Sequence, residues 1–355
     1  MAGARSLAAF TARMEAKHGE QKIANEPPAV IVPTGSLTLD YALVVGGWHL
    51  GRLYEILGAK DSGKTTVGIT SMAVCQAMFP DRGVAYVNME RTFSAERATA
   101  LGLDCSEKAR KAGRWAPLLP DSTEEASDLA RDYVASGLYS MLVLDSVGAL
   151  ESKRVLDKDA EKAADSMGRN ARIITQLTKA LATQARENSC AVLLINQPRA
   201  NMSGFGGDIS AGPKAMQHST TAKIEMRSVG GAADTRTMKF DGEDEPVGVT
   251  IRAKVSRLKN GAPGRVAQFY IMNRATEEYG PAGIDTGDEV AALGVRLGVI
   301  DQAAGGQYTL PDGTKIRGRK AIGPHLNAHP ESLAAIRSAM KFNKPLTEIE
   351  AIASA

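Results

Sequence analysis

Eight consecutive residues in the first quarter of the chain match the phosphate-binding pattern G-x-x-x-x-G-K-[ST]. They are Gly58, Ala59, Lys60, Asp61, Ser62, Gly63, Lys64 and Thr65, followed by Thr66. An apolar run at 53–57 precedes them and a helical pattern over 64–79 follows, which is the strand–loop–helix context that a P-loop requires. In that context backbone N–H groups surround phosphate oxygens, Lys64 contacts the outer phosphates of ATP, and the Thr65 hydroxyl binds Mg²⁺. A chance glycine-rich turn is the alternative, and the context disfavours it.

A carboxylate for the other side of the magnesium ion follows a second apolar run. Residues 142–145 read Leu-Val-Leu-Asp, so Asp145 ends a predicted strand. The carboxyl ends of parallel strands meet at the edge of the sheet where doubly wound folds bind ligands. We expect Asp145 to hold the metal ion, through a water molecule, although an aspartate in this position can also cap a helix.

A third carboxylate, Glu90, follows the predicted strand at 84–89. At the same sheet edge it can polarise the attacking water, which would make the protein a hydrolase rather than a passive nucleotide binder. It can equally be a glutamate near the positive end of a helix dipole. The residues alone leave these two interpretations open.

The elements that must position these side chains alternate between strands and helices. Apolar runs at 53–57, 84–89, 139–147 and 190–197 are separated by helical patterns that include 64–79 and 167–187, which predicts a parallel sheet covered on both faces. Alternating segments at 220–230, 247–259 and 265–273 predict an antiparallel extension of that sheet. We therefore predict an α/β fold with three parts. They are an N-terminal helical arm and linker (1–32), a P-loop ATPase core with a mostly parallel sheet (33–275) and a small α+β C-terminal domain (276–355).

Composition indicates a soluble intracellular protein. The 355 residues are 43% hydrophobic and carry a formal net charge of +3, which neither requires nor excludes a nucleic-acid partner. The three cysteines form no CxxC pair, so they predict neither a disulfide framework nor a zinc site. No apolar run approaches the roughly 18 residues of a membrane span, and the first 20 residues are unlike a secretory signal. We expect a cytoplasmic location and no membrane partner.

The order of the motifs resembles the RecA family of DNA strand-exchange recombinases. The resemblance runs from the N-terminal helix to about residue 342 and is most specific in PTGSLTLDYAL, GRLYEILGAKDSGKTT, LVLDSVGAL and LLINQPR. Generic P-loop proteins lack the PTGSLTLD segment at 33–40. The resemblance implies a RecA-like core, a catalytic role for Glu90, and a role for Gln197 in sensing the γ-phosphate. A buried glutamine that satisfies backbone groups is the alternative for Gln197.

The resemblance also implies two DNA-facing loops, at about 157–165 and 199–214. The second is rich in glycine, and Phe205 within it can stack on bases. A flexible lid and solvated surface cations are the alternatives. The predicted DNA-binding residues are Arg169, Arg172, Lys179, Arg199, Phe205, Gly206 and Lys214.

Two further cations match the family segment that reaches the ATP of a neighbouring subunit. Arg257 and Lys259 lie two residues apart on a predicted strand, so their side chains share a side and can act together in trans. A basic edge strand that discourages aggregation is the alternative. The N-terminal helix, with Leu7, Phe10 and Met14 at helical spacing, is expected to dock on the adjacent protomer.

Several positions depart from the family pattern. Arg97 replaces the tyrosine that commonly covers the adenine, and the strongly acidic C-terminal tail of many bacterial members is absent. These departures indicate a divergent bacterial or phage-encoded member. A basic cluster at 315–320 is either a site that gathers duplex DNA or a solvated loop.

We therefore predict a DNA-dependent ATPase that uses ATP and Mg²⁺ to form helical filaments on single-stranded DNA. The filament would pair that strand with homologous duplex DNA and exchange strands. The alternatives are an ATP-driven ring helicase or translocase and a nucleotide-gated DNA-binding scaffold without strand exchange.

Overall fold

The chain forms two compact units, Met1–Val30 and Ile31–Ala355. The computed structural model describes the backbone of residues 7–18, 30–152, 160–199, 209–210, 214–231, 234–240, 242–259 and 261–340. Within these ranges it also describes the side chains, except those in 150–169, in 199–215 and in part of the first helix. The first unit contains α1 (Leu7–His18), which includes the predicted helical positions Leu7, Phe10 and Met14. Phe10 on this helix is 54% exposed, so its apolar surface is available to a partner. The boundaries predicted for three domains stay predictions.

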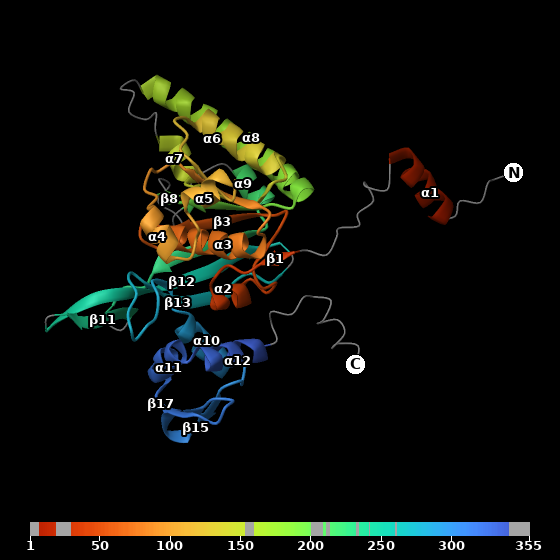
Figure 1. The fold of residues 1–355 in the computed structure, drawn as a ribbon. Helices are drawn as coiled ribbons and strands as arrows, with labels where there is room; N and C mark the ends of the chain where they lie inside the picture. The colour runs from red at the N-terminus through yellow and green to blue at the C-terminus, as the bar shows by residue number, and fades with distance from the viewer. Residues whose placement is uncertain are drawn as a thin grey trace. The chain divides into compact units, whose positions relative to one another are not determined.

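A ten-stranded sheet lies at the centre of the second unit (Figure 1). Its parallel part has the order β5–β4–β6–β7–β3–β10. These strands are β3 (Leu53–Gly58), β4 (Gly83–Asn88), β5 (Trp115–Leu118), β6 (Tyr139–Asp145), β7 (Ala191–Asn196) and β10 (Ala222–Ser228). Every residue of β3, β4 and β7 is buried, because helices cover both faces. The predicted mostly parallel sheet is confirmed.

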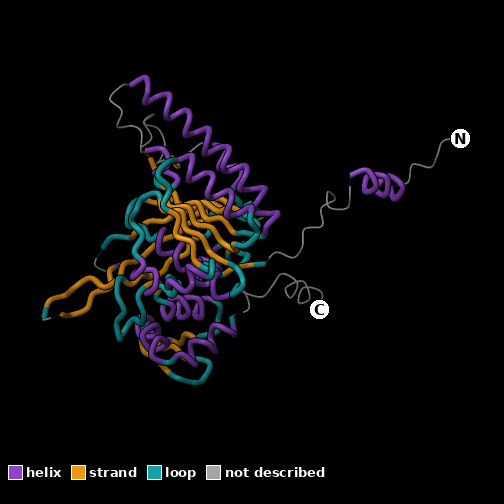
Figure 2. The backbone as a smooth tube through the Cα atoms, turned by 45° about the horizontal axis from the view of Figure 1, so that its top comes forward, coloured by secondary structure: helices purple, strands orange, loops and turns teal. Residues whose placement is uncertain are grey.

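Different helices cover the two faces of the sheet (Figure 2). On one face α3 (Lys64–Met78) packs on a core that includes Val143, and on the other α6 (Thr123–Ala135) and α8 (Ala160–Asn188) pack on a core that includes Leu144. Neighbouring residues of β6 thus point to opposite faces. The helix α8 begins at Ala160 and not at Met167, because the sequence AEKAADS at 160–166 is rich in strong helix formers. The predicted first DNA loop, 157–165, is therefore wrong for residues 160–165, which are helical, and 157–159 lie outside the described residues.

The antiparallel extension consists of β11 (Thr235–Phe240), β12 (Glu243–Leu258), β13 (Val266–Met272) and β14 (Gly283–Ile284). Strand β12 pairs antiparallel with β10, and β13 pairs with β12 only between Gly248 and Lys254. The first residues of β12 therefore pair with β11 alone, and this ribbon extends beyond the rest of the sheet (Figure 2). The predicted antiparallel extension is confirmed. Strand β12 begins at Glu243, four residues before the predicted segment 247–259, because its first residues pair with β11 in the ribbon.

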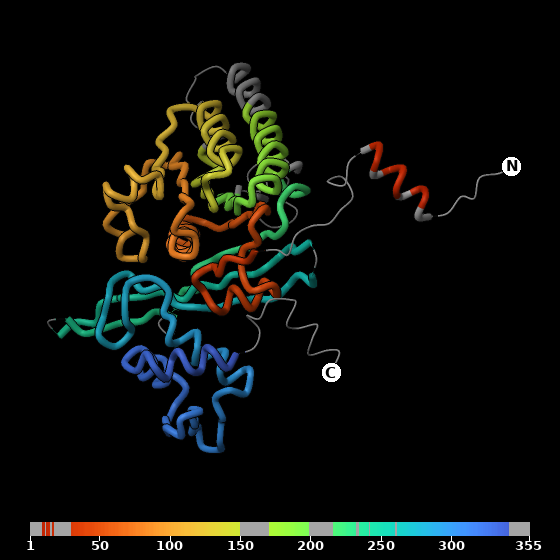
Figure 3. Tube along the Cα trace, turned by 45° about the vertical axis from the view of Figure 1, so that its right-hand side comes forward, coloured from red at the N-terminus to blue at the C-terminus, as the bar shows by residue number. Residues whose placement is uncertain are grey.

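The C-terminal residues form a small α+β group with its own core (Figure 3). Its elements are α10 (Thr286–Arg296), β15 (Asp301–Ala303), β16 (Gln307–Thr309), β17 (Lys315–Arg317), α11 (Ile322–Ala328) and α12 (Pro330–Ala339). Leu293, Ile300, Leu326 and Ile336 are buried in this core, and Leu37, the first residue of α2 (Leu37–Ala42), joins them. The remaining elements are β1 (Ile31–Val32), α2 (Leu37–Ala42), β2 (Trp48–His49), α4 (Ala95–Ala100), α5 (Glu107–Lys111), α7 (Val147–Ser152), β8 (Pro198–Arg199), β9 (Ile209–Ser210) and α9 (Lys214–Ser219).

The segment 33–40 lies between α10 and α3 and contacts both. The buried Glu289 carboxylate of α10 accepts hydrogen bonds from the Thr38 N–H (3.0 Å), the Thr38 hydroxyl (2.6 Å) and the Ser36 hydroxyl. On the other side the Ser71 hydroxyl of α3 donates to the Thr34 carbonyl at 2.8 Å. The segment thus connects the C-terminal group to the helix that begins at Lys64.

Candidate nucleotide-binding site

The predicted P-loop connects β3 to α3 and contains two positions that require glycine. Gly63 precedes the first residue of α3 with a φ of 83°, in the left-handed region. A Cβ on Gly58 would lie 2.4 Å from the Met226 carbonyl oxygen, so the turn has no room for one. Ala59, Lys60 and Asp61 at the loop tip are exposed and accessible to a ligand.

The Lys64 ammonium is folded into this loop. Its side chain donates to the Ala59 carbonyl at 2.6 Å and to the Ser62 hydroxyl at 3.3 Å. Burial lowers the pKa of Lys64, and the carboxylates of Asp145 and Glu90 partly oppose that change. The loop therefore holds a buried cation on its own oxygen atoms, and an incoming anion can replace them.

The Asp145 carboxylate lies beside the first turn of α3. Its Oδ2 accepts hydrogen bonds from the Thr65 hydroxyl and from the Tyr86 hydroxyl, each at 2.7 Å. Burial raises the pKa of Asp145, and both donors oppose that rise. In the next strand Asn88 is paired in register with Asp145, and the buried Asn88 Oδ1 has no hydrogen-bond partner among the described residues. Oxygen donors of this kind fit Mg²⁺, which also binds phosphate oxygens and water.

Glu90 and Gln197 meet at the same edge. The Gln197 Nε2 donates to Glu90 Oε1 at 2.6 Å, and the Ser146 hydroxyl donates to the same oxygen. Glu90 follows β4, Ser146 follows β6 and Gln197 follows β7, and these strands are parallel neighbours in register. The topology thus places a carboxylate, an amide and a hydroxyl next to the P-loop. Tyr86 carried no sequence signal, because it belongs to no motif, and Ser146 lies in the LVLDSVGAL motif but was assigned no role.

Comparisons with known proteins agree with this arrangement. Residues 10–276 match the family model described as RecA N-terminal domain. The chain belongs to the RecA family. It is 31% identical to Protein RecA of Azospirillum lipoferum over 319 residues, 89% of this chain and 81% of that one. It is also 31% identical to Protein RecA of Bordetella petrii over 351 residues, which cover 96% of this chain and 90% of that one.

RecA membership confirms the predicted fold and function class, an ATP-dependent recombinase that is a DNA-dependent ATPase. Identities near 30% confirm a divergent member. DNA binding and self-association into filaments are properties of this class. In the part of the chain that the structure describes, no helix has the length and hydropathy to cross a bilayer.

The predicted adenine-side residue, Arg97, lies on α4. Its guanidinium donates to the carbonyl oxygens of Asn273 at 2.8 Å and Met272 at 3.1 Å, at the end of β13. Arg97 thus fixes α4 to the antiparallel part of the sheet, and its stacking on adenine stays a prediction.

Arg257 and Lys259 lie near the amino-terminal ends of the parallel strands, whereas the P-loop follows the carboxyl end of β3. Arg257 donates to the Thr220 carbonyl at 3.0 Å and Lys259 to the His218 carbonyl at 2.6 Å, at the end of α9. Strand β10 pairs there with the start of β3, whereas Gly58 ends β3. Arg257 is level with Glu55 of β3, three residues before Gly58, which corresponds to roughly 10 Å along the strand. The structure therefore does not bring either cation to the phosphate site of its own chain.

Two predicted DNA-binding side chains are exposed on α8. Arg172 and Lys179 are seven residues apart and share a helix face, opposite the buried Leu177. The backbone of Arg169 continues this row, Arg199 lies in β8 and Lys214 begins α9. Phe205, Gly206 and the side chains of Arg169, Arg199 and Lys214 lie outside the described residues.

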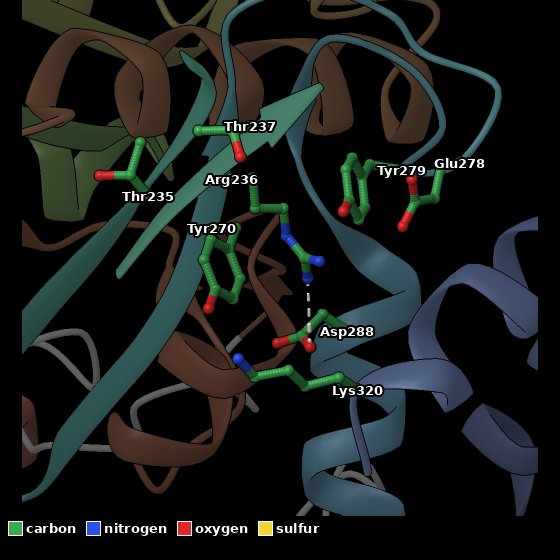
Figure 4. Close-up of a pocket in the computed structure, with 8 residues that line it drawn as sticks. All are labelled: Thr235, Arg236, Thr237, Tyr270, Glu278, Tyr279, Asp288 and Lys320. Carbon is green, nitrogen blue, oxygen red and sulfur yellow. Dashed lines mark ion pairs between the residues drawn. The ribbon is translucent and has the colours of Figure 1, made fainter. Parts of the chain in front are cut away.

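A pocket of about 300 Å³ beside α10 was not predicted from the sequence (Figure 4). The Arg236 guanidinium lies between the rings of Tyr270 and Tyr279, 3.9 and 4.2 Å from their centroids. It forms ion pairs with Asp285 (2.9 Å) and Asp288 (3.3 Å). These ion pairs join the β11–β12 ribbon to α10. Because the two carboxylates already neutralise Arg236, the pocket is a poor site for phosphate.

Proposed function

We propose that this chain binds ATP with Mg²⁺ at the P-loop edge and assembles on single-stranded DNA. The filament pairs that strand with homologous duplex DNA, exchanges strands and hydrolyses ATP. The observation that carries this proposal is the convergence of Lys64, Thr65, Asp145, Glu90 and Gln197 at one edge of the parallel sheet.

Each of these side chains has a distinct task. Lys64 exchanges its bonds to Ala59 and Ser62 for the outer phosphates of ATP. Thr65 and Asp145 would hold Mg²⁺, which neutralises charge on the phosphates. Glu90 orients and polarises the attacking water.

Gln197 is suited to couple nucleotide state to DNA binding. Its amide donates a hydrogen bond to Glu90, and the second DNA loop follows it directly through β8. A γ-phosphate offers the amide stronger, charged acceptors. Moving to them releases Glu90 to activate water and shifts the start of the loop, which is an order–disorder switch biased by ligand.

Cations on and after α8 support contact with a DNA backbone. Arg172 and Lys179 present one exposed basic face, and phosphate contacts of this kind position a strand without reading its sequence. Bases therefore stay free for pairing, and Phe205 in the second loop can stack on them.

Arg257 and Lys259 complete the ATP site of a neighbouring protomer. Their distance from the P-loop of their own chain supports action in trans, where they stabilise charge that develops on the phosphates. Hydrolysis then requires contact between protomers, and DNA that organises the filament stimulates it. The α1 helix provides a second contact through its exposed Phe10.

The decisive test measures ATP hydrolysis with and without single-stranded DNA, alongside strand exchange. We expect strong stimulation by DNA, and a loss of about 100-fold or more in Lys64→Ala. Lys108→Ala, an exposed lysine on α5, is the matched control and should behave as wild type. If DNA leaves hydrolysis unchanged, the trans contact and the Gln197 switch are wrong. DNA binding without strand exchange would favour a DNA-binding scaffold. Closed hexamers on DNA would favour a ring translocase.

A further inference from the structure

Tyr86 lies in β4 with its hydroxyl at the candidate magnesium site. The side chain is 1% exposed, and its ring packs against Phe93 and Trp115 with centroid distances of 5.1 and 6.5 Å. The hydroxyl donates to Asp145 Oδ2 at 2.7 Å. A buried tyrosine hydroxyl requires a partner, and here the partner is the carboxylate that faces the P-loop helix.

Two donors on a single oxygen restrict the carboxylate. Thr65 and Tyr86 both bond Oδ2, so rotation of the Asp145 carboxyl group breaks both hydrogen bonds. The two donors differ in what else they do. Thr65 is itself a candidate ligand for the metal ion, whereas Tyr86 is held by aromatic packing and donates its hydroxyl to Asp145.

We propose that Tyr86 is a positioning residue that holds Asp145 in the orientation required for Mg²⁺. This rests on the proposed nucleotide site and extends it to the strand beside Asp145. Partners that orient metal-binding groups typically change metal affinity 10- to 100-fold when removed. Phenylalanine would keep the ring packing and lose the hydroxyl, so the proposal assigns the effect to one hydrogen bond.

The test is Tyr86→Phe, with Tyr54→Phe as the matched control. Tyr54 is equally buried, and its hydroxyl accepts the His49 N–H at 2.8 Å, away from Asp145. Binding of a fluorescent ATP analogue is titrated with MgCl₂ and repeated in EDTA. We expect Tyr86→Phe to need about tenfold more Mg²⁺ for half-maximal binding, with unchanged binding in EDTA. Tyr54→Phe should match wild type.

A double-mutant cycle with Asp145→Asn makes the assignment specific. If Tyr86 acts through Asp145, Tyr86→Phe has no further effect on the Mg²⁺ requirement in the Asp145→Asn background. A normal Mg²⁺ requirement in Tyr86→Phe overturns the proposal, as does an equal loss of binding with and without Mg²⁺. Failure of the nucleotide site itself looks different: wild type would bind no tighter with Mg²⁺, or Lys64→Ala would bind as wild type does.

Discussion

Side chains at the P-loop edge form hydrogen bonds with one another. Lys64 is bonded to the loop, Thr65 to Asp145, and Gln197 to Glu90. Each partner belongs to the site itself, so ligand binding exchanges one set of hydrogen bonds for another. Exchange of this kind avoids leaving a buried charge unpaired, which would cost several kcal/mol per ion.

A second buried carboxyl group, Asp40 in α2, gives the protein a specific pH dependence. Its side chain accepts the Thr34 N–H at 2.8 Å, and burial raises its pKa from 3.8 to about 8. Because the folded state favours the protonated form, the stability that Asp40 contributes below pH 4 is lost as pH rises to about 8. Asparagine can accept the same hydrogen bond and carries no charge.

We therefore predict that Asp40→Asn is more stable than wild type at pH 9 and that this advantage shrinks toward pH 5. Melting temperatures measured at pH 5, 6, 7, 8 and 9 check this. An advantage that stays constant with pH would show that Asp40 does not titrate in this range.

At the scale of elements, two sets of polar contacts attach α10 to its neighbours. Glu289 accepts hydrogen bonds from Ser36 and from Thr38 in the first turn of α2, and Asp285 and Asp288 form ion pairs with Arg236 of β11. Arg236 is 11% exposed and the Asp285 side chain is fully buried. Removing one partner of a buried pair leaves an uncompensated charge.

We expect Arg236→Met to lower the free energy of unfolding by about 3 kcal/mol, because Asp285 loses its cation. Arg274→Met is the matched control. Arg274 lies over Phe240 and pairs with Glu245, but its side chain is 46% exposed, so its loss should cost less than about 1 kcal/mol. Urea unfolding of both variants makes the comparison, and equal losses would contradict the role of burial.

The sequence predicts those elements whose cause is local. Long apolar runs predicted β3, β4, β6 and β7, and a contiguous motif predicted the P-loop. The Arg236 pocket, the bond from Tyr86 to Asp145 and the contacts of Glu289 join residues far apart in the chain, so no local pattern marks them. The start of α8 was missed because the helix extends past its apolar stripe, where only helix propensity indicates it.

For the whole molecule, the separation of the P-loop from Arg257 and Lys259 predicts complementation between inactive chains. The Glu90→Gln variant has an inactive ATP site and keeps both cations. The Arg257→Ala, Lys259→Ala double variant keeps an intact P-loop edge and lacks the cations. Each alone should hydrolyse little ATP. Random head-to-tail mixing at equal concentrations should restore about a quarter of the wild-type rate, because one interface in four combines both intact halves. A mixture as inactive as its components would mean that the cations do not act in trans.

The same separation gives a chain of protomers a direction. In the proposed filament, the contact that completes each ATP site joins the P-loop edge of one protomer to the edge of the next that carries Arg257 and Lys259, so the two tips of the assembly would be chemically different. One tip exposes a nucleotide pocket that no neighbour completes, and the other exposes Arg257 and Lys259 with nothing to meet. In the proposed filament, a nucleotide in the first tip would stay intact while those behind it are hydrolysed. We therefore expect growth and release to proceed at unequal rates at the two tips of the proposed filament.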